Sequence, residues 1–313
     1  MVKPNIFDYA TSELSQDAFL CYLLEFGMDK YKDLFPCEYD IAHRFLEKCG
    51  LPYVEKIIEI RKQHQKIDVL VITPSYLLII EDKTNTKEHD DQIVNYVKKL
   101  KEDNILCSNR EIKVCYLKTM DYVRDYVSSN QNVLPQSNCR SLRREDMLAL
   151  LEENRTSNFI FESFYCRHNE MEQRIKKCDD EDIKTWITGK WFKYLSGLLK
   201  NHQYNIDWVS NPRGGFYACY FDWYNCGKGE KYKQIEISFD DNLSLTSEVK
   251  LCFKFASDSK DITRNSECLI KDLQKIIENK GFKIANRMGR TTTYAYKYAD
   301  NKQDILDFIK VDF

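Results

Sequence analysis

The clearest pattern of apolar and polar positions lies in residues 67–83. Two runs rich in Val, Ile and Leu flank Thr-Pro-Ser at 73–75, which is typical of a turn. The pattern predicts a β-hairpin in which Asp68 lies opposite Glu81, and the strand period of two places Lys83 on the same face. The other positions are apolar on both faces, so we expect helices to cover the hairpin on each side.

Apolar periodicity around the hairpin predicts a layered α/β domain. Helical spacing is found in residues 11–26, 39–48, 88–103, 140–153 and 158–177, and strand patterns are found in 54–63 and 112–118. Residues 119–140 have no regular pattern. The order of strand, hairpin, helix and strand predicts a parallel crossover through helix 88–103. We therefore expect a mixed central sheet flanked by helices.

A run of acids at 179–182 has no apolar anchor, and we expect a domain boundary there, between residues 1–178 and 183–313. The second segment predicts a smaller α+β domain with an antiparallel sheet. Its expected elements are helix 183–200, strands 216–224, 231–239 and 248–256, helix 265–280, strands 282–287 and 291–298, and helix 302–310. Trp186 and Trp191 belong either to its core or to a base-stacking surface. The pattern leaves its role open between substrate binding and partner binding.

Composition narrows the function classes. The 313 residues are 43% hydrophobic and 31% charged, and the formal net charge is −2. Nucleic acid would therefore have to bind through a local basic groove rather than through the overall field. No apolar run approaches the ~18 residues of a membrane span and a signal-peptide core is absent, so we expect a soluble, cytoplasmic protein. The twelve cysteines form no Cys-x-x-Cys pair, which predicts reduced core thiols such as Cys49 and Cys115.

The charged end of the hairpin has two interpretations. Ionised groups at the end of a covered sheet are costly unless they pair with each other or hold a metal. A salt bridge would satisfy Lys83 and one of the acids. Asp68 and Glu81 repel each other, however, and a single ammonium does not neutralise both. This arrangement favours a bound divalent cation.

Asp68 followed by Glu81-Asp82-Lys83 resembles the catalytic signature of the PD-(D/E)XK nuclease superfamily, with Ile67 in place of the proline. Residues 5–16, Asn-Ile-Phe-Asp-Tyr-Ala-Thr-Ser-Glu-Leu-Ser-Gln, resemble the opening of one bacterial family of that superfamily. The resemblance implies a restriction-endonuclease-like core for residues 1–178.

A second motif lies on helix 88–103. Gln92 and Tyr96 are one helical turn apart, and the pair resembles the Gln–Tyr motif of nucleases related to the RecB nuclease domain. There the glutamine contacts the substrate or the metal shell, and the tyrosine supports it. We therefore expect Gln92 and Tyr96 to form a substrate-binding pair. Glu13 has two interpretations: it completes the metal site, as the acid of the first helix does in similar nucleases, or it complements the helix dipole.

The resemblance implies Mg²⁺-dependent hydrolysis of phosphodiester bonds, with Mn²⁺ as a substitute and Ca²⁺ supporting little turnover. The metal would be held by hard oxygen ligands, namely Asp68, Glu81, the backbone carbonyl of Asp82, and Glu13. Lys83 would orient or deprotonate the attacking water. Gln92 would steady the scissile phosphate or a metal-bound water.

We therefore expect a metal-dependent nuclease that acts on DNA, in defence against foreign DNA or in DNA repair. One alternative is a catalytically inactive nuclease-fold module that binds nucleic acid or a partner protein. Another is a structural hairpin in an unrelated α/β protein. Asp68, Glu81 and Lys83 fill all three signature positions, which argues against an inactive module. These residues leave open RNA as a substrate, endo- or exonuclease action, sequence specificity and a dimeric state.

Overall fold

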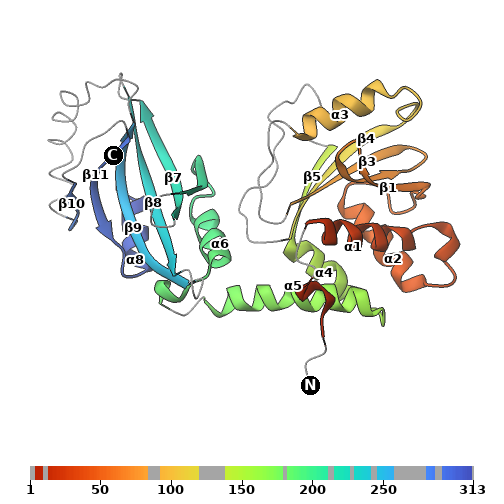
Figure 1. Cartoon of the computed structure of the whole chain (residues 1–313), viewed down its shortest axis with the longest axis horizontal. Helices are drawn as coiled ribbons and strands as arrows, with labels where there is room; N and C mark the ends of the chain where they lie inside the picture. Colours follow the sequence, from red (N-terminus) through yellow and green to blue (C-terminus); the bar gives the residue numbers. More distant parts are fainter. Residues whose placement is uncertain are drawn as a thin grey trace. The chain divides into compact units, whose positions relative to one another are not determined.

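The computed structural model describes residues 4–9, 13–83, 92–119, 138–178, 182–210, 215–225, 229–240, 245–256, 280–285 and 291–311. They belong to two compact units, Met1–Arg174 and Ile175–Phe313, which are drawn in Figure 1. The division falls in the last turn of one long helix, α5 (Phe159–Lys177), shortly before the acidic run at the predicted boundary. Among the described residues, no helix combines the length and the apolar character needed to cross a bilayer.

The first unit is built on a five-stranded sheet with the strand order β1-β2-β3-β4-β5. Strand β2 is antiparallel to both of its neighbours, β1 and β3, whereas β3, β4 and β5 run parallel to one another. The strands are β1 (Glu59–His64), β2 (Ile67–Ile72), β3 (Tyr76–Lys83), β4 (Glu111–Lys118) and β5 (Cys139–Arg143). This arrangement confirms the predicted mixed central sheet.

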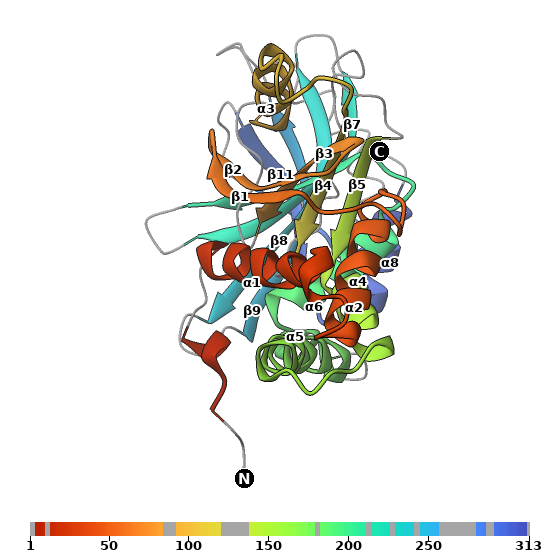
Figure 2. The ribbon, with the colours of Figure 1, turned by 90° about the vertical axis from the view of Figure 1, so that its right-hand side faces the viewer.

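Helices cover both faces of this sheet, as Figure 2 shows. On one side lie α1 (Glu13–Phe26), α2 (Pro36–Lys48), α4 (Arg144–Glu153) and α5, and on the other lies α3 (Gln92–Glu102). The described residues of the unit also form two 3₁₀ turns, η1 (Ile6–Asp8) and η2 (Asp29–Tyr31). The two covered faces explain why the hairpin strands are apolar on both sides.

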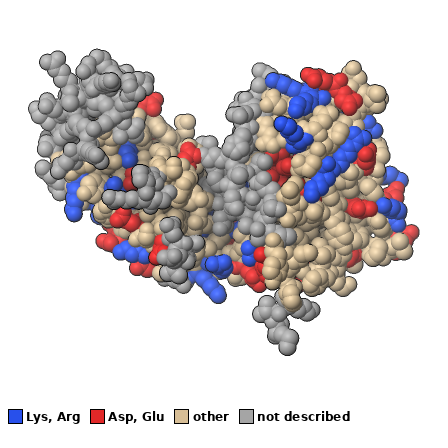
Figure 3. Space-filling model, viewed as in Figure 1, with Lys and Arg blue, Asp and Glu red and all other residues tan. Residues whose placement is uncertain are grey.

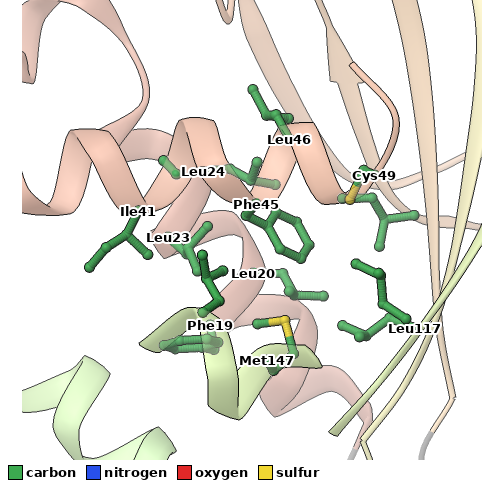
Figure 4. Close-up of a cluster of buried hydrophobic side chains, with 14 of the residues drawn as sticks. Phe19, Leu20, Leu23, Leu24, Ile41, Phe45, Leu46, Cys49, Leu117 and Met147 are labelled. Atoms are coloured by element: carbon green, nitrogen blue, oxygen red, sulfur yellow. The ribbon is translucent and has the colours of Figure 1, made fainter. Parts of the chain in front are cut away.

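The larger core of the first unit lies between the sheet and the four-helix side (Figure 4). Leu20 of α1, Phe45 of α2, Met147 of α4 and Leu117 of β4 are each at most 1% exposed. Burial of one such side chain contributes about 1.5–3 kcal/mol. A second core joins α3 to the opposite face through Ile93, Val97, Leu100, Leu70 and Ile79. The predicted core cysteines Cys49 and Cys115 are buried and free, which agrees with the sequence.

The hairpin of β2 and β3 has the predicted register. Leu70 is paired with Ile79, as expected from a turn centred after Pro74. The turn itself is closed by the Tyr76 main-chain N–H, which donates to Thr73 Oγ1 at 2.8 Å. A slip of one residue would move every side chain to the wrong face, so this register decides which acids share a side of the sheet.

One strand of this unit differs from the sequence-based prediction. β5 lies where the pattern predicts irregular chain and the start of a helix, and α4 begins only at Arg144. The sequence of β5, Cys-Arg-Ser-Leu-Arg, contains no β-branched residue. The strand forms because the edge of β4 offers main-chain hydrogen-bonding groups, and this long-range pairing outweighs local propensity.

The second unit contains a six-stranded sheet with the order β10-β11-β9-β8-β7-β6, and the antiparallel pairing confirms the prediction. Its described residues form η4 (Ile183–Thr185), α6 (Thr188–Leu198), β6 (Tyr204–Val209), β7 (Phe216–Asn225), β8 (Glu230–Asp240), β9 (Leu245–Ala256), β10 (Lys283–Ile284), β11 (Thr291–Tyr298) and α8 (Lys302–Ile309). Strand β6 is an addition to the predicted elements. The predicted helix 265–280 lies outside the described residues.

Trp186 and Trp191 are core residues of the second unit. Both are fully buried, and their ring centroids are 4.8 Å apart. The Trp191 indole N–H donates to the Thr246 hydroxyl, which in turn donates to the Trp186 carbonyl at 2.7 Å. Because both rings are buried and engaged within the unit, these two tryptophans form no base-stacking surface.

Candidate functional site

The carboxylate of Asp68 lies against the main chain of β3. Its Oδ2 accepts a hydrogen bond from the Asp82 N–H at 3.0 Å. The last pair in the register of the two strands is Val69 with Ile80, and Asp68 and Glu81 are the next residues beyond it. A side-chain oxygen therefore bonds the β3 main chain at the end of the ladder, and this bond holds Asp68 beside the peptide that joins Glu81 to Asp82.

Glu81 and Asp82 are both 0% exposed, and they belong to opposite faces of the sheet. Glu81 follows the alternation of Ile79, which packs in the core of α3. Asp82 follows the alternation of Ile80, which packs in the core of α1 and α2. Burying a carboxylate is costly unless hydrogen bonds or opposite charges compensate, so both acids are held by specific surroundings rather than by water.

The carboxylate of Asp82 is bonded to helix α1 through Gln16. Because a carboxylate only accepts hydrogen bonds, the Gln16 amide is oriented with its nitrogen toward Asp82. This nitrogen lies 3.2 Å from both Asp82 oxygens, and the Gln16 oxygen accepts from Thr119 Oγ1 at 2.7 Å. Thr119 follows directly after β4, and both Gln16 and Thr119 are buried. The three side chains thus join α1 to the ends of β3 and β4.

A second link between α1 and the hairpin passes through Gln63. Its amide nitrogen donates to Asp17 Oδ2 at 3.0 Å and to Asp68 Oδ1 at 3.2 Å. Asp17 is 1% exposed, although it is ionisable. The backbone of Gln63 has φ 54°, in the left-handed region, which costs a non-glycine residue roughly 1 kcal/mol or more. This conformation places the amide between two carboxylates that the sequence separates widely.

The carboxyl ends of the parallel strands carry a row of basic residues. Lys83 of β3 is paired in the register with Lys118 of β4, and Lys118 is paired with Arg143 of β5. The row lies two residues beyond Glu81, whose partner on β4 is Tyr116. Backbone positions alone therefore gather positive charge next to the acidic end of the hairpin.

Gln92 and Tyr96 contact each other, as their spacing predicts. The Gln92 amide nitrogen is hydrogen-bonded to the Tyr96 hydroxyl, which donates to the Lys66 carbonyl oxygen at 2.6 Å. Tyr96 is buried, whereas Gln92 is half-buried. Lys66 lies in the turn that leads to Asp68, so this contact fixes the start of α3 relative to the charged end of β2.

Arg140, Arg143 and Arg144 form a basic cluster in the sequence, which predicts either a phosphate contact or a solvated helix start, and the structure divides this cluster. Arg140 and Arg143 are exposed on β5. Arg144 is instead buried, and its guanidinium donates to Glu172 Oε2 from Nε at 3.3 Å and from Nη2 at 3.2 Å. Its Nη1 donates to the Thr119 carbonyl oxygen at 3.2 Å. Arg144 is therefore a structural residue, and the interpretations of it as a phosphate contact or a solvated helix start are both wrong.

The structure brings together some of the predicted site residues and adds others. Asp68, Glu81 and Asp82 lie at one strand end, and Gln92 with Tyr96 lies on α3. The side chains of Glu13 and Lys83 lie outside the described residues. The additional residues are Gln16, Asp17, Gln63, Lys118 and Thr119. Gln16 and Asp17 fall in the apolar stripe of α1. Polar residues within such a stripe are unusual, and this is the sequence signal that could have indicated them.

The donor set suits a hard divalent cation. The described residues contain no group of three or more His, Cys, Asp and Glu side chains that would bind a metal by themselves. Asp68 and Asp17 nevertheless lie around one amide nitrogen, and the buried carboxylate of Glu81 is on the adjacent strand. These groups and the Asp82 carbonyl are all oxygen donors, the ligands that Mg²⁺ prefers. A cation at this strand end would also offset the cost of burying Glu81.

A mixed sheet with helices on both faces and acids at the end of its antiparallel hairpin defines a nuclease-like fold. A family model of the PD-(D/E)XK nuclease superfamily matches residues 4–191, more than half of the chain. The chain therefore belongs to the PD-(D/E)XK nuclease superfamily. No curated protein and no solved structure matches it. The matched segment includes the whole hairpin and α3, so the motif residues lie within the family region.

Proposed function

We propose that the protein is a metal-dependent nuclease that hydrolyses phosphodiester bonds of DNA. The observation that carries this proposal is the 3.0 Å hydrogen bond from the Asp82 N–H to Asp68 Oδ2. It holds one acid of the motif beside the peptide that follows the other, Glu81, within the segment matched by the family model. Superfamily membership supports the reaction class, and the oxygen donors support a divalent cation, for which we propose Mg²⁺ with Mn²⁺ as a substitute.

The residues at this strand end would have separate roles in hydrolysis. A bound divalent cation supplies charge neutralisation at the phosphate and activation of water. Asp68, Glu81 and the Asp82 carbonyl would hold it, and α1 would contribute Glu13 or Asp17. Lys83 would orient the attacking water, and it would either take up the proton of that water as a neutral amine or, as an ammonium, stabilise the negative charge that develops. A water held in line with the phosphorus is the positioning that phosphoryl transfer requires.

Residues outside the acidic group would hold the phosphate backbone. Gln92 is half-buried and hydrogen-bonded to Tyr96, which fixes its side chain. A side chain fixed in this way suits a donor to a phosphate oxygen or to a bound water. Arg143, which is exposed, continues the row of Lys83 across the strand ends, and the buried Lys118 lies between them in the register. Positive side chains in such a row would offset the phosphate charge and fix the register of the nucleic acid.

The outer surface of α3 supplies a local basic patch for nucleic acid. Lys98, Lys99 and Lys101 of this helix are exposed. Figure 3 shows Lys and Arg side chains over this part of the first unit, with Asp and Glu side chains beside them. The formal net charge of the chain is −2, so a local patch of this kind would provide the electrostatic contact that the overall charge does not. We further propose a cytoplasmic role in defence or repair, with the second unit binding substrate or a partner.

A cleavage assay tests the proposal directly. The purified chain is incubated with labelled linear, circular and single-stranded DNA and with RNA, with and without Mg²⁺. We expect Mg²⁺-dependent cleavage of DNA that is lost in Asp68→Ala, Glu81→Ala and Lys83→Ala. Glu38→Gln is the control, because Glu38 is a buried acid of α2 whose carboxylate accepts from Thr156 instead. Equal cleavage by all three site variants and wild type would refute the assignment.

Calorimetry separates this function from an inactive nuclease-fold module. An active enzyme should bind Mg²⁺ in the absence of nucleic acid, and Asp68→Ala should weaken that binding. A module that only binds nucleic acid or a protein would bind DNA without cleaving it and would be insensitive to Mg²⁺.

A further inference from the structure

A chain of buried polar side chains runs beneath the candidate site. It consists of Gln16 on α1, Asp82 on β3, Thr119 after β4, Arg144 on α4 and Glu172 on α5. Gln16 bonds both Asp82 and Thr119, the Thr119 carbonyl accepts from Arg144, and Arg144 forms an ion pair with Glu172. Purely apolar packing would hold these helices on the sheet equally well, so stability alone does not explain why these buried positions are polar.

The polar contacts at α1 form a closed circuit. Gln16 donates to the Asp82 carboxylate, and the Asp82 N–H donates to Asp68. Gln63 then joins Asp68 to Asp17, and Asp17 is the neighbour of Gln16 in the chain. A circuit of this kind fixes the helix to both strands of the hairpin. Any displacement of α1 along β3 has to break at least one of these bonds.

Asp82 has a double role in this circuit. Its main-chain N–H donates to Asp68 and so holds that carboxylate in place. Its own carboxylate accepts from Gln16 and so holds helix α1 against the sheet. The α1 residues near Gln16 include Asp17 and Glu13. The Gln16–Asp82 bond therefore sets the distance between the Asp17 carboxylate of α1 and the carboxylates of the hairpin.

We propose that Gln16 and Asp82 are a positioning pair for the metal site, which they align through α1 and Asp68 without touching the substrate. This inference rests on the proposed function. Thr119 connects this positioning pair to the Arg144–Glu172 ion pair. Its carbonyl oxygen accepts from Arg144, and its hydroxyl contacts Gln16. Residues that orient metal ligands typically change metal affinity or activity about 10–100-fold when they are substituted.

An exchange of donor and acceptor tests the pair. Gln16→Glu places a carboxylate against that of Asp82, and like charges at this distance repel. Asp82→Asn leaves two amides that can still bond. The double variant Gln16→Glu with Asp82→Asn restores one carboxylate and one amide with their positions exchanged. Mg²⁺ affinity of the intact chain is measured by titration calorimetry, alongside kcat and KM for DNA and the unfolding temperature.

The expected results differ between variants. Gln16→Glu should bind Mg²⁺ at least about 10-fold more weakly. Its kcat should fall at low Mg²⁺ and recover at high Mg²⁺, and KM for DNA should change little. The double variant should return to within about 3-fold of wild type, as expected for a directly coupled pair. Glu38→Gln, the buried control, should lower the unfolding temperature without changing Mg²⁺ affinity. If Gln16→Glu does not fold, Gln16→Met removes the amide at similar size and carries the same expectation.

Two results would overturn the proposal. One is wild-type Mg²⁺ affinity in a folded Gln16 variant, which would reduce the pair to a stability contact like that of Glu38. The other is a double variant as impaired as Gln16→Glu. Failure of the proposed function has a different signature, because wild type itself would then neither bind Mg²⁺ nor cleave DNA, and this result would overturn both proposals together.

Discussion

The Asp82 main-chain N–H donates to the Asp68 carboxylate at 3.0 Å, across the point where β2 and β3 stop pairing. This bond gives Asp68 a structural function at a buried strand end. We propose a second function for Asp68, in which its remaining oxygen positions hold a cation beside Glu81. The two functions can be separated by substitution.

Asp68→Asn should abolish cleavage while the fold persists. The amide oxygen can still accept from the Asp82 N–H, and only the exposed bond from Gln63 to the other oxygen is lost from the structure. The charge that would hold a cation is also lost. We expect cleavage to fall by at least about 100-fold and the unfolding free energy to change by less than about 1 kcal/mol. Cleavage rates and urea unfolding are measured on the same preparation. The prediction would be contradicted if Asp68→Asn lost much of its unfolding free energy while its folded fraction cleaved DNA at the wild-type rate.

Tyr96→Phe should affect stability slightly and cleavage more. The substitution removes the hydroxyl that bonds the Lys66 carbonyl and Gln92. Loss of such a hydrogen bond costs about 1 kcal/mol. We expect a larger relative loss in kcat, because Gln92 would no longer be held in place. Gln92→Ala in the Tyr96→Phe background should then add little, and full additivity of the two losses would argue against this coupling.

Arg143→Ala should weaken DNA binding in a salt-dependent manner. Arg143 is exposed and continues the row of Lys83 and Lys118, so we expect it to contact a phosphate. Loss of one such contact should reduce the slope of log affinity against log salt by about 1. Arg140 is the matched control on β5, because it is exposed but paired with Cys115 and so lies outside the row. Equal effects of Arg140→Ala and Arg143→Ala on the slope would exclude a specific role for the row.

Arg144→Met should destabilise the first unit strongly. It would leave Glu172 buried without its cationic partner, and breaking a buried ion pair in this way costs about 3–5 kcal/mol. Removing both charges, with Arg144→Met and Glu172→Leu together, should cost clearly less. Urea unfolding of the two variants measures the difference. A double variant that is less stable than Arg144→Met would show that the pair is not the dominant interaction of these residues.

Acid should destabilise the protein through His168. This histidine of α5 is buried, its Nδ1–H donates to the Phe164 carbonyl at 2.9 Å, and burial lowers its pKa from 6.5 to about 4. Between pH 6.5 and 4 the unfolded chain binds a proton that the folded chain does not, so stability falls as pH decreases through this range. The shift corresponds to about 3 kcal/mol. Urea unfolding at pH 7 and pH 5 should show the loss, and His168→Gln should lack this contribution.

The sequence predicts the parts of the site that depend on local pattern. The hairpin register follows from two apolar runs and one turn, and it places Leu70 opposite Ile79 as expected. The Gln92–Tyr96 contact follows from helical spacing within one element. In both cases the interacting residues lie close in the chain, so periodicity alone is sufficient to pair them.

The remaining contacts join residues far apart in sequence, and periodicity does not predict them. Gln63 bonds Asp17 only because α1 packs against the end of β1, and its left-handed backbone has no glycine to signal it. Arg144 looks like part of a basic cluster because the pattern does not reveal Glu172 beside it. Strand β5 forms on the free edge of β4 without a strand-like sequence. Each of these depends on tertiary packing.

The middle residue of the Glu-x-Lys motif is not a free position in this chain. Asp82 is bonded through its main chain and its carboxylate, and a bulkier or apolar side chain there would take the Asp82 acceptor away from the buried Gln16 amide. Relatives with another residue at this position should therefore differ at the position of Gln16 as well. Residues 16 and 82 are 66 positions apart in the chain. We expect the contact between them to appear among relatives as correlated substitution at these two positions.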